Sequence, residues 1–264
     1  MNQDQVKEKL LAIEDAPLDF SLIFSGKKSK KVNGLYKPET REIVIHNRNF
    51  NDDNLLLYTA IHEYAHHLHA YAQGGKLSAR AHTPEFWAIL HNLLERAESQ
   101  NIYRNVFASS PELTALTETI RMKHLAENGA IVKGLGEKLL LAQELCEKIG
   151  GRFEDYIDRV LRIPRLAATT AIKMHQYNVN PSVGPDNMRF LVGIRNEDVR
   201  ATAEAALIGG KSPDTVKVAA KAQKTPSIEE YPRMKLEKEK ARLERTLDSI
   251  KKRLDEITQE LEQC

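Results

Sequence analysis

Apolar and polar positions follow two different patterns along this chain, and the change between them separates an N-terminal part from a longer C-terminal part. Short apolar runs of strand length occur at residues 18–24, 32–36 and 42–46, with polar turns between them. From Ser110 onward, apolar residues recur at intervals of three and four, which is typical of helices. The pattern predicts an α+β protein with a small sheet near the N-terminus and helices elsewhere.

Three helices are predicted beside these strands. One spans residues 2–14, and a longer one spans residues 54–72, where a Gly-Gly pair ends it. The third follows Thr83, a good N-cap, and has Pro84 in its first turn, where proline is tolerated. Its apolar residues recur at i, i+3, i+4 and i+7, so we expect it to pack against the second helix.

The C-terminal part is predicted to be a series of helices separated by glycine and proline. The expected helices cover residues 110–128, 131–149, 153–161, 165–177, 186–192, 196–208 and 212–222. Pro226 and Pro232 then mark a linker. We therefore expect a first domain over residues 1–108, a helical domain over residues 109–225, and a linker with a coiled coil over residues 226–264.

The last stretch of the chain carries a heptad repeat that begins near Met234. Apolar residues fill both core positions of the repeat: Leu236, Leu243, Ile250 and Ile257 in one, and Leu247, Leu254 and Leu261 in the other. Such a repeat favours a C-terminal coiled-coil helix and a homodimer formed through it. A long helix packed on its own domain is the alternative.

The strongest chemical signal is a His-Glu-x-x-His motif inside the second predicted helix. Residues four apart lie on one face of a helix, so His62 and His66 can bind the same ion. Two imidazoles at this spacing suit Zn²⁺, and Glu63 is placed to act on a water bound to the metal. The alternative is a chance match of buried helical histidines.

A catalytic zinc site uses three protein ligands and leaves a place for water, so a third ligand is needed. The candidates that follow the motif are His69, His82, Glu85, His91 and Glu95. His69 lies about 10 Å along the helix axis from His62, so both cannot hold one ion. His82 is favoured because it lies at a corner before a helix, from which a side chain can point back. Glu95 remains open, since some zinc peptidases take a Glu from a following helix.

These motifs together resemble the SprT-like zinc metallopeptidases and their YgjP-like and WLM relatives. The resemblance is carried by His62-Glu63-x-x-His66, by His82-x-Pro-Glu-Phe-Trp and by the strands at 34–36 and 42–45, and it covers roughly residues 15–100. It implies a small zincin-like domain, a Zn²⁺ cofactor, His82 as the third ligand and Glu63 as the general base. The implied activity is a zinc metalloendopeptidase acting on a protein substrate.

The resemblance also makes DNA-associated proteins a candidate substrate class. Tyr64, Tyr71 and Arg80 are candidate oxyanion helpers. In the helical domain, residues 153–171 follow the order helix, short turn, helix, as in a helix-turn-helix that binds DNA. The basic residues that could face phosphates there are Arg159, Arg162, Arg165 and Lys173. An ordinary helical bundle with basic surface residues is the alternative for this region.

A second function from a different class competes with the peptidase. In it, the chain is a DNA-binding or scaffolding protein of a mobile element, and its metal site is structural or vestigial. The formal net charge is only +2, so any contact with nucleic acid must come from a local patch. One patch lies at Lys27, Lys28, Lys30 and Lys31, where the lysines predict either a solvated hairpin tip or a contact to phosphate or substrate.

Composition also bears on the cellular compartment. No apolar run approaches the roughly 20 residues needed to cross a bilayer, and the polar N-terminus predicts no signal peptide. Cys146 and Cys264 are far apart and form neither a disulfide framework nor a cysteine-based metal motif. We therefore expect a cytoplasmic protein without a membrane partner.

Overall fold

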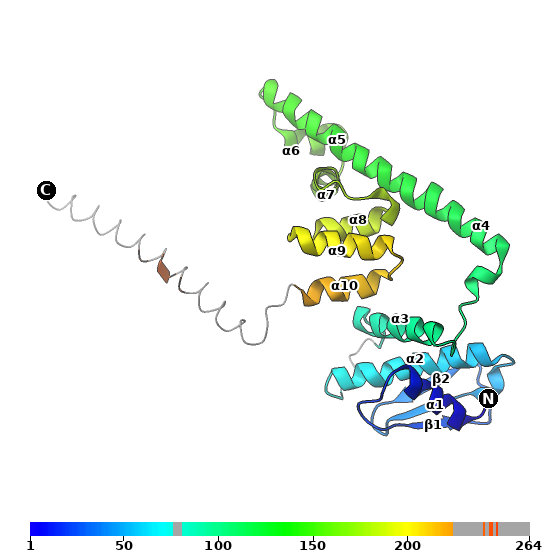
Figure 1. Cartoon of the computed structure of the whole chain (residues 1–264). Helices are drawn as coiled ribbons and strands as arrows, with labels where there is room; N and C mark the ends of the chain where they lie inside the picture. Colours follow the sequence, from blue (N-terminus) through cyan, green and yellow to red (C-terminus); the bar gives the residue numbers. More distant parts are fainter. Residues whose placement is uncertain (76–80, 224–239, 241–242, 245–246, 248–264) are drawn as a thin grey trace. The chain divides into compact units, whose positions relative to one another are not determined.

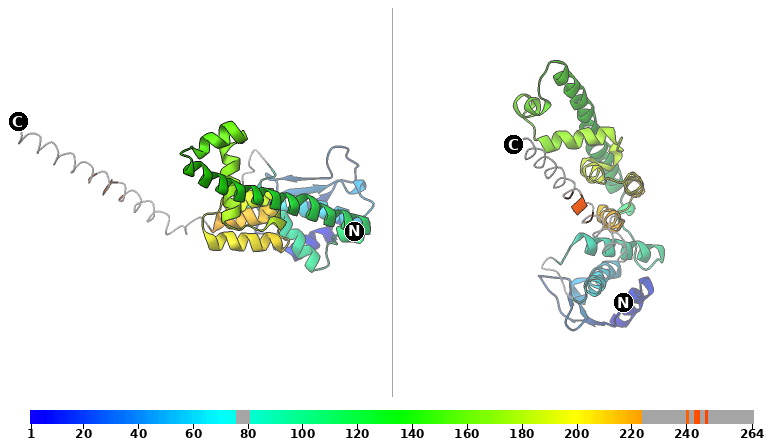
Figure 2. Two further views of the ribbon diagram at one scale, coloured as in Figure 1. Left: turned by 90° about the horizontal axis from the view of Figure 1, so that it is seen from above. Right: turned by 90° about the vertical axis from the view of Figure 1, so that its left-hand side faces the viewer.

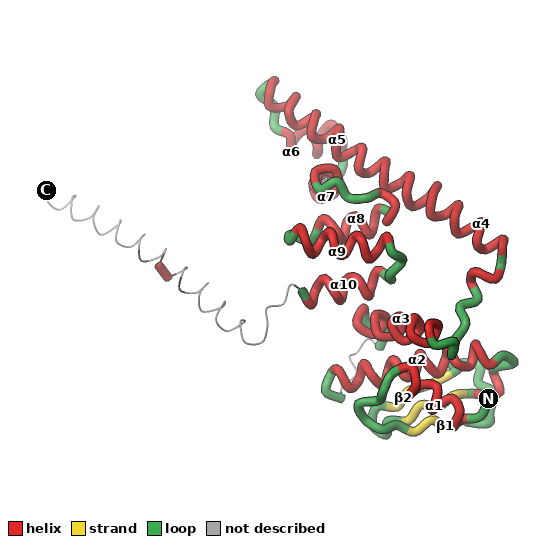
Figure 3. The backbone as a smooth tube through the Cα atoms, viewed as in Figure 1, coloured by secondary structure: helices red, strands yellow, loops and turns green. Residues whose placement is uncertain are grey.

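The computed structural model describes residues 1–75, 81–223, 240, 243–244 and 247. Contacts along the chain divide it into two compact units, Met1–Ala220 and Lys221–Cys264. The account below concerns the first unit, which is mostly helical with one small sheet (Figures 1 and 3). The coiled coil expected after Met234 falls almost wholly outside the described residues.

Three short strands form a mixed sheet in the order β1-β3-β2. β1 (Ser21–Phe24) pairs in parallel with β3 (Glu42–Ile45), and β2 (Gly34–Lys37) pairs with β3 in the antiparallel direction. The expected sheet near the N-terminus is therefore present. Ile43 and Ile45 of the central strand are fully buried, and both strand neighbours of Ile43, Leu22 and Tyr36, are buried beside it.

Side-chain caps fix where the three N-terminal helices begin. Asn2 caps α1 (Gln3–Ile13), Asp52 caps α2 (Asp53–Ala72), and Thr83 caps α3 (Pro84–Ser99). The Gly-Gly pair after α2 has φ values of +70° and +84°, a left-handed conformation that suits glycine and ends the helix. All three helices lie close to the expected positions.

α2 is the central element of the N-terminal region. It packs against β2 and β3 on one side and against α3 on another, and α1 contacts it as well (Figure 1). As a result, 13 of its 20 residues are buried, including the polar residues Glu63, His66, His67 and His69. Burying polar groups is costly unless they are paired, so a cluster of buried polar side chains on one helix indicates a candidate functional site.

The apolar core of the N-terminal region surrounds α2. Leu10 of α1, Ile61 and Tyr64 of α2, and Phe86 and Leu93 of α3 are all fully buried in it. Each such side chain contributes roughly 1.5–3 kcal/mol relative to an exposed one. This core therefore holds α3 firmly on α2 and positions the corner that precedes α3.

One long helical run opens the C-terminal region, and here the expected break between residues 128 and 131 is wrong. α4 (Pro111–Thr119) continues through a π-helical stretch, η3 (Ile120–Ala126), into α5 (Glu127–Lys148) (Figure 1). Gly129 lies inside this helical run, at a point where another backbone approaches. A Cβ there would meet the carbonyl oxygen of Pro181 at 2.5 Å.

Shorter helices follow α5, and α6, α7 and α8 among them contact it directly. The helices are α6 (Phe153–Asp155), the π-helical η4 (Tyr156–Leu161), α7 (Arg165–Gln176), α8 (Pro185–Val192), α9 (Glu197–Ile208) and α10 (Pro213–Ala222). Short 3-10 turns lie elsewhere along the chain at Asn47–Asn49, Phe107–Ser109 and Pro181–Val183. α7 crosses α5 closely at Gly136, where a Cβ would lie 2.0 Å from the carbonyl oxygen of Ala171 (Figure 2). The region has two apolar clusters of its own, separate from the N-terminal core.

In the part of the chain that the structure describes, none of the helices combines the length and the apolar character that a membrane span requires. Cys146 is a buried free thiol on α5.

Candidate metal centre

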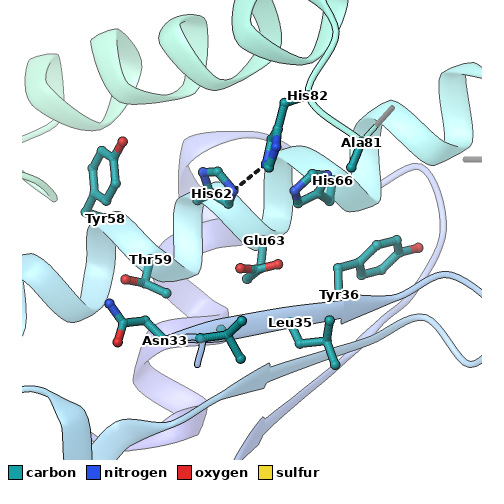
Figure 4. A pocket seen from close by; sticks show the side chains of 12 residues that line it. Asn33, Leu35, Tyr36, Tyr58, Thr59, His62, Glu63, His66, Ala81 and His82 are labelled. Atoms are coloured by element: carbon teal, nitrogen blue, oxygen red, sulfur yellow. Dashed lines mark hydrogen bonds between the residues drawn. The ribbon is translucent and has the colours of Figure 1, made fainter. Parts of the chain in front are cut away.

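Three histidine rings converge where α2 meets the start of α3. His62 and His66 come from successive turns of α2, and His82 comes from the residue before the α3 cap (Figure 4). One ring nitrogen from each lies within 4.8 Å of the others, and the Nε2 atoms of His62 and His82 are 3.1 Å apart. Within the described ranges, no other group of His, Cys, Asp or Glu side chains meets this condition.

The spacing of the His62 and His82 nitrogens fits a metal ion. Two nitrogens bound tetrahedrally at 2.0–2.1 Å from zinc lie about 3.4 Å apart, so the observed 3.1 Å requires only a small adjustment. Without a cation or a shared proton between them, the facing lone pairs of two neutral imidazoles would repel each other. The donor set of His62, His66 and His82 can therefore hold a metal ion.

Burial keeps two of the three rings neutral. Burial, with a smaller effect from the nearby His82, lowers the pKa of His62 to about 4. Burial likewise lowers the pKa of His66 to about 3, with smaller effects from the neighbouring histidines. Neutral imidazole is the form that binds metals, so protons do not compete for these two ligands near neutral pH.

The structure brings His82 to the motif and leaves the other candidates for the third ligand elsewhere. The Nε2 atom of His69 lies 2.8 Å from the Gln73 amide nitrogen and 3.4 Å from the Thr83 hydroxyl. His91 contacts the Ser212 hydroxyl at 2.7 Å, and Glu95 forms an ion pair with Lys211. Glu85 is also absent from the cluster.

Aromatic side chains at the start of α3 support the cluster. The Phe86 ring stacks on His66 with centroids 4.2 Å apart, and the Trp87 ring stacks on His82 at 5.5 Å. Phe86 is fully buried in the core, so the position of His66 is fixed from this side. The buried Nδ1 atom of His66 has no hydrogen-bond partner among the described residues.

Glu63 projects from α2 on the side of the strands, below the three rings (Figure 4). Its side chain lies against Gly34 of β2, where a Cβ would meet the Glu63 Cγ at 2.8 Å and Oε1 at 2.9 Å. Burial raises the pKa of Glu63 to about 7, although a hydrogen bond from the Tyr36 backbone opposes this. The carboxyl group is therefore poised to exchange a proton near neutral pH.

A second buried contact connects the next turn of α2 to the same strand residue. The Nε2 atom of His67 lies 3.0 Å from the carbonyl oxygen of Leu18, so it carries the proton and donates it. The Nδ1 atom then accepts a hydrogen bond of 3.1 Å from the Tyr36 hydroxyl. Glu63 and His67 thus both bind Tyr36, and together they fix β2 against α2.

An open pocket of about 500 Å³ joins these groups. Residues 32–36 line one wall, Tyr58, Thr59 and the motif residues line another, and residues 81–82 complete it (Figure 4). Glu63 and the three imidazoles face the same space. The pocket can thus place a substrate bond beside a metal ion and a proton acceptor.

The expected oxyanion helpers are not in this pocket. Tyr64 is buried and donates a 2.7 Å hydrogen bond to the carbonyl oxygen of Glu14. Tyr71 is half exposed and lines a different hollow, beside Arg41, and Arg80 falls outside the described residues. The expectation for Tyr64 and Tyr71 is therefore wrong. Tyr58, which lines the pocket, was not anticipated.

Gly34 and Tyr36 are two further site residues that sequence reasoning missed. A glycine inside a strand pattern signals a close approach of another group, so Gly34 could have been noticed. Tyr36 could not, because no local pattern shows which helix residues will face a strand about 30 positions away.

The expected kinship with SprT-like peptidases rests on short motifs within residues 15–100. Searches against protein-family models, curated proteins and solved structures find no match for this chain.

Proposed function

We propose that this protein is a zinc-dependent metallopeptidase, related to the SprT-like enzymes, in which His62, His66 and His82 hold the ion and Glu63 is the general base. One observation carries the proposal: three imidazole nitrogens within 4.8 Å of one another share a pocket with a buried carboxyl group. Three nitrogen ligands with an open fourth position are typical of catalytic rather than structural zinc.

The ion, the general base and the residues that position the base have separate roles in the proposed reaction. Zn²⁺ would polarise the scissile carbonyl group and lower the pKa of water towards about 7. Glu63 takes the proton of the attacking water and passes it to the leaving amine. Gly34 leaves room for this carboxyl group, and the Tyr36 backbone fixes its orientation.

β2 offers a binding surface for a peptide. Among the described strands it pairs only with β3, so no described strand covers its other edge beside the pocket. An extended peptide can add to such an edge through backbone hydrogen bonds, while its side chains enter neighbouring pockets. The exposed side chains of Val32 and Leu35 provide apolar contacts there.

The competing function is a DNA-binding or scaffolding protein whose metal site is structural. The arrangement of η4, a short turn and α7 favours it, because this is the order of a helix-turn-helix. However, Arg159 pairs with Asp155 and Arg165 with Asp158, which neutralises half of the expected phosphate contacts. DNA-associated proteins as substrates would combine both functions.

Zinc content and proteolysis, measured together, test the peptidase proposal. We expect one zinc per chain in the wild type and in the surface control His124→Ala, and loss of zinc in His62→Ala, His66→Ala and His82→Ala. Glu63→Gln should keep zinc and lose chelator-sensitive cleavage of casein. Full zinc retention in His82→Ala, or normal cleavage by Glu63→Gln, would overturn the assignment.

A gel-shift assay at graded salt separates the two functions. DNA binding without any chelator-sensitive cleavage would favour the DNA-binding or scaffolding protein. Cleavage that requires zinc and Glu63 would favour the peptidase, whether or not DNA also binds.

A further inference from the structure

A strongly basic loop borders one end of the candidate pocket. Residues 26–33, called the basic loop below, carry four exposed lysines: Lys27, Lys28, Lys30 and Lys31. None of the four ammonium groups forms an ion pair within the described part of the chain, whereas Lys7 and Lys37 nearby are both paired. Their charges are therefore available to a partner.

The basic loop is held in a defined conformation by two asparagines of the turn at Asn47–Asn49. The Asn49 side chain binds both the backbone of Ser29 and the side chain of Asn33, at 2.8–2.9 Å. Asn47 accepts a 3.0 Å hydrogen bond from Gly26, which has a φ of +65°. Such anchoring reduces the entropy lost when a partner binds.

The anchored loop runs directly into the pocket wall. Val32 and Asn33 line the pocket. Lys31 precedes Asn33 by two residues, so their Cα atoms are at most about 7 Å apart. Among the described residues that line the pocket, Glu63 alone is acidic, and its carboxyl group is turned towards Gly34. The pocket thus has no acidic group that could neutralise the lysines at this end, and the local potential is positive.

We propose that the basic loop selects peptide substrates with acidic side chains about three to five residues to the carboxyl side of the cleaved bond. The proposal rests on the peptidase function given above. Gly34 faces Glu63, and Lys31 and Lys30 precede Gly34 by three and four residues, so they lie at most about 10–14 Å from it along the backbone. A peptide that runs antiparallel to β2, as β3 does, brings its carboxyl side to the lysines.

An acidic peptide fits this surface better than a nucleic acid does. The edge of β2 that no described strand covers offers backbone donors and acceptors that match an extended polypeptide. Val32 and Leu35, both nearly half exposed, offer apolar contacts that a phosphate backbone cannot use. The lysines add charge where the peptide leaves the strand.

Binding to a zinc-loaded Glu63→Gln protein tests the charge preference without turnover. The probes are two fluorescein-labelled peptides that differ only in their carboxyl-side part. One has four Glu residues there, and the other has four Gln residues. We expect the Glu peptide to bind on the order of tenfold more tightly at low salt, because several exposed ion pairs act together. The difference should vanish at 1 M salt, where the Debye length is about 3 Å.

Matched lysine variants assign the preference to the loop. Replacing Lys27, Lys28, Lys30 and Lys31 by Gln should abolish it, while the same change at Lys9, Lys123, Lys138 and Lys148 should preserve it. Equal binding of the two peptides, or a preference that survives in the loop variant, would overturn the proposal. The proposal would also be overturned if DNA oligonucleotides of equal charge bound more tightly than the Glu peptide and this binding required the same lysines.

Cleavage mapping keeps this inference separate from the peptidase proposal. Wild-type and loop-variant proteins are compared on a mixture of proteome-derived peptides, and zinc content is measured in both. Acidic residues enriched on the carboxyl side of wild-type cuts, and lost in the loop variant, would support selection by the loop. Zinc-dependent cutting without that enrichment would overturn the selection alone. Absence of any zinc-dependent cutting would overturn the peptidase proposal.

Discussion

The hydroxyl of Tyr36 lies 3.1 Å from the Nδ1 atom of His67, and the backbone of the same tyrosine donates a hydrogen bond to Glu63. Glu63 and His67 are four residues apart, so they lie on one face of α2. A single turn of helix therefore binds a single strand residue through both its backbone and its side chain. This double contact sets the distance between the carboxyl group and the pocket wall.

Tyr36→Phe should destabilise the protein by about 1–2 kcal/mol, because it leaves the buried Nδ1 atom of His67 without a partner. Urea unfolding measures the change. Tyr71→Phe is the matched control: its side chain is half exposed, and the variant should unfold within about 0.5 kcal/mol of the wild type. Equal midpoints for both variants would show that the hydroxyl contact contributes nothing.

Gly34→Ala should lower turnover on the order of 100-fold while zinc remains bound. The added Cβ would meet the Glu63 side chain at 2.8–2.9 Å and push the carboxyl group from its place. Gly134→Ala is the control, since nothing lies within 4 Å of that site on α5, and it should stabilise the helix by about 0.5–1 kcal/mol. Unimpaired turnover in Gly34→Ala would contradict this role of Gly34.

The stability of the metal-free protein should depend on the protonation of Glu63. Its pKa is raised to about 7 from an ordinary 4.5, so the folded state binds the proton more tightly than the unfolded state. The stability gained is complete below pH 4.5 and is lost as pH rises through 7. Glu63→Gln should therefore gain stability relative to the wild type between pH 5 and 8, by at most about 3 kcal/mol.

Urea unfolding of both metal-free proteins across this pH range provides the measurement. The lowered pKa values of His62 and His66 act in the opposite direction, but they are common to both proteins and largely cancel in the comparison. A constant difference between the two proteins from pH 5 to 8 would refute the effect of burial on Glu63.

Metal binding should change the fluorescence of the protein. Trp87 is the only tryptophan, and its ring stacks on His82 with centroids 5.5 Å apart. Zinc that binds His82 will alter the environment of the indole, so emission should change until one equivalent is bound. His82→Ala should abolish the response and His124→Ala should keep it. Unchanged emission at saturating zinc, with binding verified by dialysis, would place the ion elsewhere.

Local signals explain why much of the site was predictable from the sequence. The bounds expected for α2 agree with the structure because a capping Asp and a Gly-Gly pair mark its ends. The position of His82 followed from Thr83, since a side chain just before an N-cap can point back across the preceding helix. These features depend on neighbouring residues only.

The failures come from contacts between distant segments. A break was expected between residues 128 and 131, yet Gly129 lies within a continuous helix, at a point where the distant Pro181 backbone approaches it. The contacts of Tyr36 with Glu63 and His67 depend on how the sheet packs on α2, and no periodicity within either element reveals that packing. Tyr64 was misjudged for the same reason, because its partner is Glu14 at the end of α1.

The directions in which the α2 side chains point limit the insertions and deletions that this helix can tolerate. His62 and His66 point towards α3, while Glu63 points towards the strands (Figure 4). His67 also faces the strands, because its ring contacts Tyr36 of β2. Each residue of an α-helix rotates the next by about 100°. One codon lost or gained between Asp52 and His62 would turn all four side chains away from their partners at once. Natural variants of this helix should therefore differ by replacement and keep its length.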